Sequence, residues 1–455
     1  MNKLRLRPLL EAAWPTEWWG RVPGNGWRWA AYAAFAAQVL LFTRFQGAAG
    51  PYWGPVLFGV SGGLLSVFAL LFFRRQPLAL PRARARQQAR RLPWGGLLLL
   101  LGAGWVLKYQ APVILGNPVN VAYSDVIPIL QNYVARFRSG EVVYKYITNL
   151  PYPLFPNHLP WQWLPYVLPD AWGLDYRWWG LGLLLLLGFG AWQVVLARQP
   201  IGKAEYVFKA LLPAFLLVSI IRHDAGIFSQ VVEPTIIAYY CLLAASVLSR
   251  SVLVQAAALV LCLLSRYSVV FWVPLLGVVL WFEAGWRHTL RVAGLVLAGV
   301  LAFYVVPFLS KDWTIFTHAL SEYRLATLGE WGHNLNGNGQ PYHVFNGLGM
   351  AAWFYTYAPG DLSNKISWLQ RAHVVLSAGT ALGFGLLYWR WRGQLNYRYF
   401  LLVALQAYLL VFYLFLQIPY SYLISLTVFM SAFVVLALHG PAVGAARPVG
   451  PAVRS

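Results

Sequence analysis

The sequence is poor in charge, and above all in acidic charge. Only 11% of its 455 residues are charged, 14 Asp and Glu face 35 Lys and Arg, and 59% of the residues are hydrophobic. Mean hydropathy is +0.56. A soluble domain must cover its surface with charge, so this composition predicts a polytopic membrane protein. The net charge of +21 does not indicate nucleic acid, because arginine in short loops between apolar runs is what orientation in a membrane requires.

Cysteine is also scarce, and the motifs of soluble nucleotide chemistry are missing. Cys241 and Cys262 both lie inside apolar runs, which favours buried small side chains over a disulfide or a metal pair. The sequence has no GxxxxGK[ST] loop, no GxGxxG, no HExxH and no paired CxxC. The N-terminus lacks the pattern of a signal peptide, so we expect an interfacial segment followed by a retained first span.

Long apolar runs are abundant instead. Runs near the roughly 20 residues that cross a bilayer predict about twelve transmembrane helices, and hence an all-α fold. They lie near residues 27–45, 52–73, 94–113, 178–197, 206–221, 234–249, 251–265, 267–283, 291–308, 369–389, 398–417 and 420–438.

The basic residues predict the orientation of these spans. Arginines crowd the connections at 74–91 and 390–398, so both connections are expected in the cytoplasm. Alternation then places both termini in the cytoplasm of an inner (plasma) membrane. It places 114–177, 222–233, the Ser265–Ser268 turn and 309–366 outside. Ten of the 14 acids lie in these outer segments, which is where we expect the chemistry.

The same pattern divides the chain into five parts. Residues 1–93 hold two spans and a basic loop, and residues 94–310 form a membrane core that includes the first outer loop, 114–177. Residues 311–366 form a second large outer loop with a helical first part and a turn-rich second part. Residues 367–438 hold the last spans, and residues 439–455 are predicted to be a disordered tail.

The first outer loop contains the leading catalytic candidate. Asp125 comes just before an amphipathic pattern that continues to Phe137, which predicts a short helix along the membrane surface. Asp125 is a candidate general base. It is also in the position of a helix N-cap, and the two roles coexist only if one carboxylate oxygen stays free. After Gly140, repeated prolines interleaved with aromatics exclude a regular helix.

Two groups of polar residues lie where spans reach the outer boundary. The first is Arg222, His223 and Asp224, and the second is Arg266 with Tyr267. Guanidinium groups bind phosphate oxygens in bidentate fashion, so both arginines are candidate ligands of a lipid phosphate. The alternative is that they snorkel to the interface. Lone histidines in outer loops are expected to be solvated, and no spacing among them imitates a metal site. They are His158, His318, His333 and His343.

These residues resemble a known family. An early acid in an outer loop, a surface helix, the Gly-Glu-x-x-Tyr of Gly140, Glu141 and Tyr144, and a Pro/Tyr-rich run toward a span are similar to the GT-C superfamily. That superfamily contains polyprenyl-phosphate-sugar-dependent glycosyltransferases, and the bacterial mannosyltransferase-like membrane proteins are the most similar. The resemblance covers about residues 94–310.

The resemblance implies a transferase of the cell envelope. It implies Asp125 as the base, a polyprenyl-phosphate sugar as donor, and a glycan, lipid or protein as acceptor. It also implies that Glu141 and Tyr144 contribute to substrate binding. Two features depart from the family: the acid loop follows the third span instead of the first, and Asp-x-Asp or Glu-x-Asp is absent. A divalent metal is therefore left open, and no other cofactor is expected.

The physics of the reaction agrees with this set of residues. Inverting glycosyl transfer needs a base for the acceptor hydroxyl and cations for the departing phosphate. Two other classes remain open: a secondary transporter, which would carry ionisable groups at the middle of its spans, and a glycan polymerase or ligase that uses the same donors. The place of the acids in the structure discriminates a transferase from a carrier.

Overall fold

The computed structural model describes residues 24–76, 78, 85–333 and 335–439. Residues 440–455 of the predicted tail and most of the predicted N-terminal interfacial segment lie outside these residues, whereas His439 is described and buried. In the described part the fold is all-helical, with two isolated β-bridges, Ile147–Leu154 and Leu335–Pro341. The all-α class is therefore confirmed.

Seven stretches of helix in the described part of the chain are long and apolar enough to cross a membrane. Their helices are α3 (Gly24–Leu40) with η1 (Leu41–Phe45) and α4 (Gln46–Phe73), α5 (Ala85–Gly116), α9 (Tyr176–Leu183) with η3 (Leu184–Gly188) and α10 (Phe189–Ala197), α11 (Lys203–His223), α15 (Trp286–Val300) with η5 (Leu301–Val305), α19 (Leu362–Trp391) and α20 (Tyr397–Leu414).

Four further apolar helices are shorter, at 10–17 residues. They are α12 (Glu233–Val247), α13 (Val252–Leu263), α14 (Trp272–Glu283) and α21 (Ser421–Ala437). The first long stretch contains two helices, because Gly50 adopts φ +69° and breaks it before Pro51. Each predicted run thus corresponds to helix, but within the described residues seven stretches qualify as spans by length and apolarity, so the count of twelve is not confirmed.

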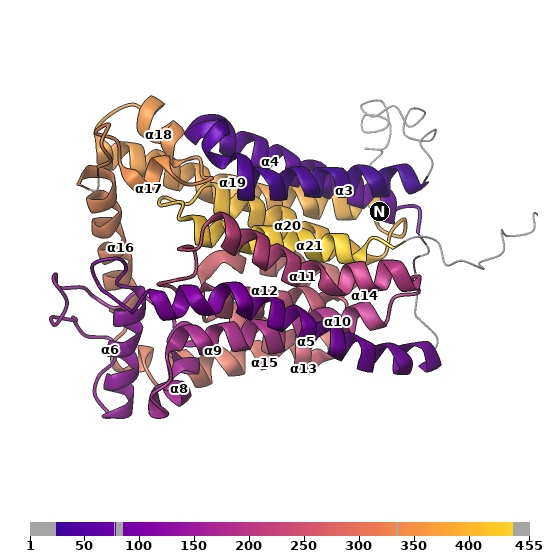
Figure 1. Cartoon of the computed structure of the whole chain (residues 1–455), viewed down its shortest axis with the longest axis horizontal. Helices are drawn as coiled ribbons and strands as arrows, with labels where there is room; N and C mark the ends of the chain where they lie inside the picture. Colours follow the sequence, from indigo (N-terminus) through magenta and orange to yellow (C-terminus); the bar gives the residue numbers. More distant parts are fainter. Residues whose placement is uncertain (1–23, 77, 79–84, 334, 440–455) are drawn as a thin grey trace, which may run out of the picture.

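The helices run side by side along the long axis of the molecule (Figure 1). α12, α20 and α21 form its centre, and nearly every residue of these three helices is buried. α3 and α4 pack against α20 and α21, so the N-terminal hairpin contacts the C-terminal helices. In this centre the Gln406 side chain accepts from Ser66 Oγ at 2.5 Å and its Nε2 donates to Ser431 Oγ at 3.1 Å. Such bonds hold helices together where apolar burial does not distinguish a neighbour from lipid.

The outermost helices present apolar side chains outward. Only 6% of the most apolar segment of the α15 stretch and 17% of that in α19 is buried. Leu382 and Leu386 of α19 are 71% and 75% exposed. Contiguous exposed leucine is unfavourable in water, and it indicates a lipid-facing surface.

The smaller helices gather at one end of the bundle, which we call the loop end. They are α6 (Val126–Arg138), α7 (Pro160–Trp163), η2 (Leu164–Tyr166), α8 (Val167–Ala171), η6 (Leu309–Lys311), α16 (Ile315–Gly332), α17 (Tyr342–Phe345) and α18 (Ala351–Tyr357). α6 and α16 lie across this end, roughly perpendicular to the bundle (Figure 1). α6 is the amphipathic helix predicted after Asp125, and it buries Ile127, Leu130 and Tyr133.

The connections rich in arginine meet at the opposite end, which we call the basic end. Arg74 Nε donates to Gln394 Oε1 at 2.8 Å, and Asn396 donates to the Leu78 carbonyl. Arg91 donates to the carbonyls of Gln199 and Ile201. The predicted separation of basic connections from acidic loops is therefore present as two ends of one bundle.

Candidate functional site

The two large loops, residues 114–177 and 309–366, contact each other at the loop end. The Tyr146 hydroxyl of the first loop donates to Glu322 Oε1 of α16 at 2.9 Å. The rings of Phe155 and His318 meet edge to face with centroids 5.3 Å apart. A surface is therefore built jointly by segments that are more than 150 residues apart in the chain.

Asp125 lies at this junction and is half-buried. It occupies the N-cap position of α6, yet its side chain makes no capping bond. The Tyr152 hydroxyl donates to Asp125 Oδ2 instead, and Oδ1 has no hydrogen-bond partner among the described residues. Burial, the bond to Asp125 and the Asp125 charge raise the pKa of Tyr152, so its hydroxyl stays protonated and donates. The capping alternative fails, and one carboxylate oxygen stays free.

A second acidic group faces the same place from the second loop. Glu330 Oε2 lies 2.8 Å from His343 Nδ1, and the Tyr420 hydroxyl lies 3.5 Å from Glu330 Oε1. Burial raises the pKa of Tyr420, and the carboxylates of Glu330 and Asp125 raise it further. Both carboxylates therefore act on one hydroxyl. We call Asp125, Tyr152, Glu330, His343 and Tyr420 the loop junction.

Arg266 lies behind the loop junction with a carboxylate of its own. Its Nη1 and Nη2 donate to the two oxygens of Glu233 at 3.0 and 2.5 Å. The Glu233 side chain is 1% exposed and that of Arg266 is 18% exposed. This is a bidentate ion pair at the start of α12. The pair compensates the charge of Arg266, whose side chain remains partly exposed.

His158 lies inside the first loop, near enough to Arg266 for the charge of Arg266 to act on its ring. Its Nδ1 lies 3.1 Å from the Tyr133 hydroxyl, and Tyr144 donates to its carbonyl at 2.9 Å. Burial and the charge of Arg266 lower the pKa of His158 to about 4, so it is neutral. The expectation of solvated histidines is wrong for His158, because the Tyr133 hydroxyl and other groups of its own loop enclose the ring. His343 is half-buried, and its ring bonds Glu330.

The other predicted residues have separate surroundings. Arg222 is exposed at the end of α11 and lies over the Tyr109 ring, 5.7 Å from its centroid. Asp224 Oδ1 accepts from the Gly226 N–H in a turn, and His223 is exposed beside it. Arg222 and Arg266 thus have different partners, and no contact joins them in the described part of the chain.

The remaining two predicted residues lie near the first loop and α16. Tyr267 follows Arg266 and is 43% exposed, with its ring edge-on to Phe316. Glu141 is exposed and pairs with Lys145 at 2.6 Å, a bond that lowers the pKa of Glu141. Tyr144 of the same motif is buried, and its hydroxyl donates to the carbonyl oxygen of His158.

Sequence reasoning missed Glu330, His343, Tyr152 and Tyr420. Glu330 and His343 lie 13 residues apart, on either side of a turn-rich segment, and no local spacing joins them. The available signal was the density of tyrosines near the outer boundary, including Tyr420 and Tyr422 at the start of the last span. Within the described residues, no group of three or more His, Cys, Asp or Glu could hold a metal ion.

Comparison with protein-family models, with curated proteins and with solved structures found no match.

Proposed function

We propose that this protein is a membrane glycosyltransferase of the GT-C type. It transfers a sugar from a polyprenyl-phosphate donor to an acceptor at the outer, periplasmic face of the plasma membrane. The observation that carries the proposal is Asp125, which stands at the head of α6 without capping it and is oriented by Tyr152. A carboxylate with one free oxygen at the meeting point of two loops suits a general base.

The proposal includes twelve passes through the membrane. The hairpin of α3 and α4 counts as two, the other six long stretches as one each, and the four shorter apolar helices complete the set. The loop end then faces outward, and the basic end and both termini face the cytoplasm, in accord with the distribution of arginine.

The proposed reaction accounts for the proton, for the bond that forms and for the bond that breaks. Asp125 accepts the proton of the acceptor hydroxyl as that oxygen forms a bond to the anomeric carbon of the sugar. The bond from that carbon to the phosphate oxygen breaks, and the lipid phosphate leaves with the electron pair. Arg266 has N–H groups beyond the two that bond Glu233, and these donate to the phosphate oxygens as the negative charge develops. Attack from the face opposite the phosphate inverts the anomeric centre.

The transporter alternative has less support. A carrier would place ionisable groups at the middle of its spans. The buried Lys209 of α11 lies close to the start of its helix, where its Nζ donates to the Leu436 carbonyl at 3.0 Å and pairs with Glu205 at 3.0 Å. Asp125, Glu233 and Glu330 gather at the loop end. This distribution favours chemistry at the membrane boundary.

The test is transfer from radiolabelled polyprenyl-phosphate sugars by the purified chain. The parent is expected to transfer one of a panel of sugars, and Asp125→Asn is expected to lose about two to four orders of magnitude in turnover with its melting temperature retained. Asp312→Asn is the control, because it removes an exposed acid from the second outer loop, and no role in binding is assigned to that acid. Parent-like turnover of Asp125→Asn would exclude the base. Transfer of a whole glycan with no transfer of a single sugar would favour a polymerase or ligase.

A further inference from the structure

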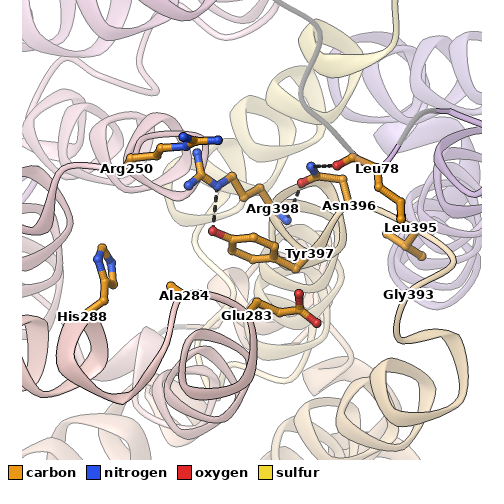
Figure 2. Close-up of a pocket in the computed structure, with 10 residues that line it drawn as sticks. All are labelled: Leu78, Arg250, Glu283, Ala284, His288, Gly393, Leu395, Asn396, Tyr397 and Arg398. Carbon is orange, nitrogen blue, oxygen red and sulfur yellow. Dashed lines mark hydrogen bonds between the residues drawn. The ribbon is translucent and has the colours of Figure 1, made fainter.

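The basic end contains a pocket that the proposed reaction does not use. Its volume is about 440 Å³, and it is lined by residues of five connections or helix ends (Figure 2). Arg250 comes from the turn between α12 and α13, Glu283 from the end of α14, and His288 from the start of α15. Tyr397 and Arg398 come from the start of α20. This pocket is at the end of the bundle opposite the loop junction.

Two arginines supply its charge. Arg398 is only 7% exposed, and Arg250 is exposed. Both reach toward the same side of the pocket from different elements (Figure 2). Neither forms an ion pair with a carboxylate among the described residues, whereas the other buried cations, such as Lys209 and Arg177, do.

The nearby acid is already occupied. Glu283 accepts from the Tyr388 hydroxyl at 2.7 Å and lies 3.5 Å from Arg392 Nε. It therefore compensates Arg392, and the pocket keeps the positive charge of Arg250 and Arg398. Two like charges that share a pocket repel each other, and this arrangement is stabilised when an anion lies between them.

Arg398 is held in position for such an anion. Its Nε donates to the Tyr397 hydroxyl at 3.0 Å, and its Nη1 donates to the Leu248 carbonyl at 3.3 Å. These bonds fix the plane of the guanidinium and leave further N–H groups free. Arg250 makes no such bond, so it can close on a ligand.

We propose that this pocket binds the phosphate of an anionic lipid headgroup. Guanidinium groups pair with phosphate oxygens in bidentate fashion, and basic pockets between transmembrane helices are suited to anionic headgroups. The lining also contains Leu78, Ala284 and Leu395, which suit the glycerol and the first methylenes of a lipid. The inference concerns the opposite end of the molecule and does not depend on the proposed transferase activity.

The experiment uses the purified full chain in detergent, and native mass spectrometry counts the lipid that it retains. Phosphatidylglycerol and phosphatidylcholine are added in parallel, and inorganic phosphate is tested as a competitor. The parent is expected to retain phosphatidylglycerol in preference to phosphatidylcholine. Arg250→Gln is expected to weaken this retention by about tenfold, because it removes a charge-assisted bond. Arg250→Glu is expected to abolish it.

One control and one further variant make the result decisive. Arg198→Glu changes the net charge equally at the same end, at an exposed arginine that does not line the pocket, and it is expected to behave as the parent. Equal loss in Arg198→Glu would assign the effect to general surface charge and overturn the site. Equal retention of the two lipids would also overturn it, and competition by millimolar inorganic phosphate would overturn the lipid as its ligand. Arg398→Gln is a second variant, and the exposed Arg250 carries the test if Arg398→Gln does not fold.

Discussion

At the scale of the residue, the ion pair of Arg266 and Glu233 stabilises the fold, and Arg266 is also the proposed ligand of the donor phosphate. Removing one partner of a buried ion pair leaves an uncompensated charge, which costs about 3–5 kcal/mol. Arg266→Gln should therefore lower the melting temperature by leaving the 1%-exposed Glu233 side chain unpaired. The double variant Arg266→Gln with Glu233→Gln should recover most of that stability, because two amides can bond to each other.

The double variant then tests the phosphate ligand. If Arg266 holds the donor phosphate, the stable double variant should bind a polyprenyl-phosphate sugar more weakly by about 1.5–3 kcal/mol. Lys311→Gln is the control, since it removes an exposed cation of the second loop, and no role in phosphate binding is assigned to that residue. Parent-like donor binding by the double variant would reduce Arg266 to an interfacial anchor.

His158 predicts a dependence of stability on pH. Its pKa in the folded chain is about 4, below the ordinary value of 6.5. Between these two pH values His158 is protonated in the unfolded chain but neutral in the folded chain. The free energy of unfolding therefore falls as the pH drops from 6.5 toward 4. Melting temperatures at pH 7 and pH 5 should differ less for His158→Asn than for the parent. An equal loss in both proteins would contradict this assignment.

At the scale of the element, two glycines fix the second loop against the turn between α20 and α21. A Cβ at Gly347 would lie 1.9 Å from the Pro419 carbonyl oxygen, and one at Gly349 would lie 2.2 Å from Pro419 Cβ. Atoms that are not bonded to each other do not approach this closely, and the backbone at Pro419 cannot move far enough to relieve the overlap. The glycines therefore let the loop approach the turn that carries Tyr420 of the loop junction.

Gly347→Ala should push the second loop away from this turn. We expect a loss of about 1–3 kcal/mol in stability, as for an overpacked core, together with a loss of transfer. Gly337→Ala is the control, because nothing lies within 4 Å of a Cβ at that position. Unchanged melting and turnover for Gly347→Ala would show that the close approach is dispensable.

Elements were predictable from the sequence to different degrees. The apolar runs and the amphipathic run after Asp125 yielded helices close to their predicted limits, because burial and lipid contact impose a local periodicity. The last part of α16 continued through Gly329, where the sequence predicted turns, because packing of the buried Trp331 overrides local propensity. Asp125 was found by its position in a local pattern. Glu330 and His343 were not, since only the meeting of two loops makes them part of a site.

At the scale of the whole molecule, the two ends of the bundle predict the topology. Single cysteines at Ser139 of the loop end and Gln87 of the basic end are both placed at exposed positions. A membrane-impermeant thiol reagent applied to intact cells should label Ser139→Cys and spare Gln87→Cys. The parent is an internal control, because Cys241 and Cys262 are buried. Labelling of Gln87→Cys from outside would reverse the orientation.

The loop junction is assembled from three widely separated segments of the chain. Asp125 and Tyr152 leave the ribosome early, Glu330 and His343 much later, and Tyr420 only just before the last helix. A nascent chain that stops short of α20 exposes the first loop but lacks the tyrosine that both carboxylates face. We therefore expect that a prematurely terminated chain is inserted in the bilayer but does not react with lipid-linked sugars.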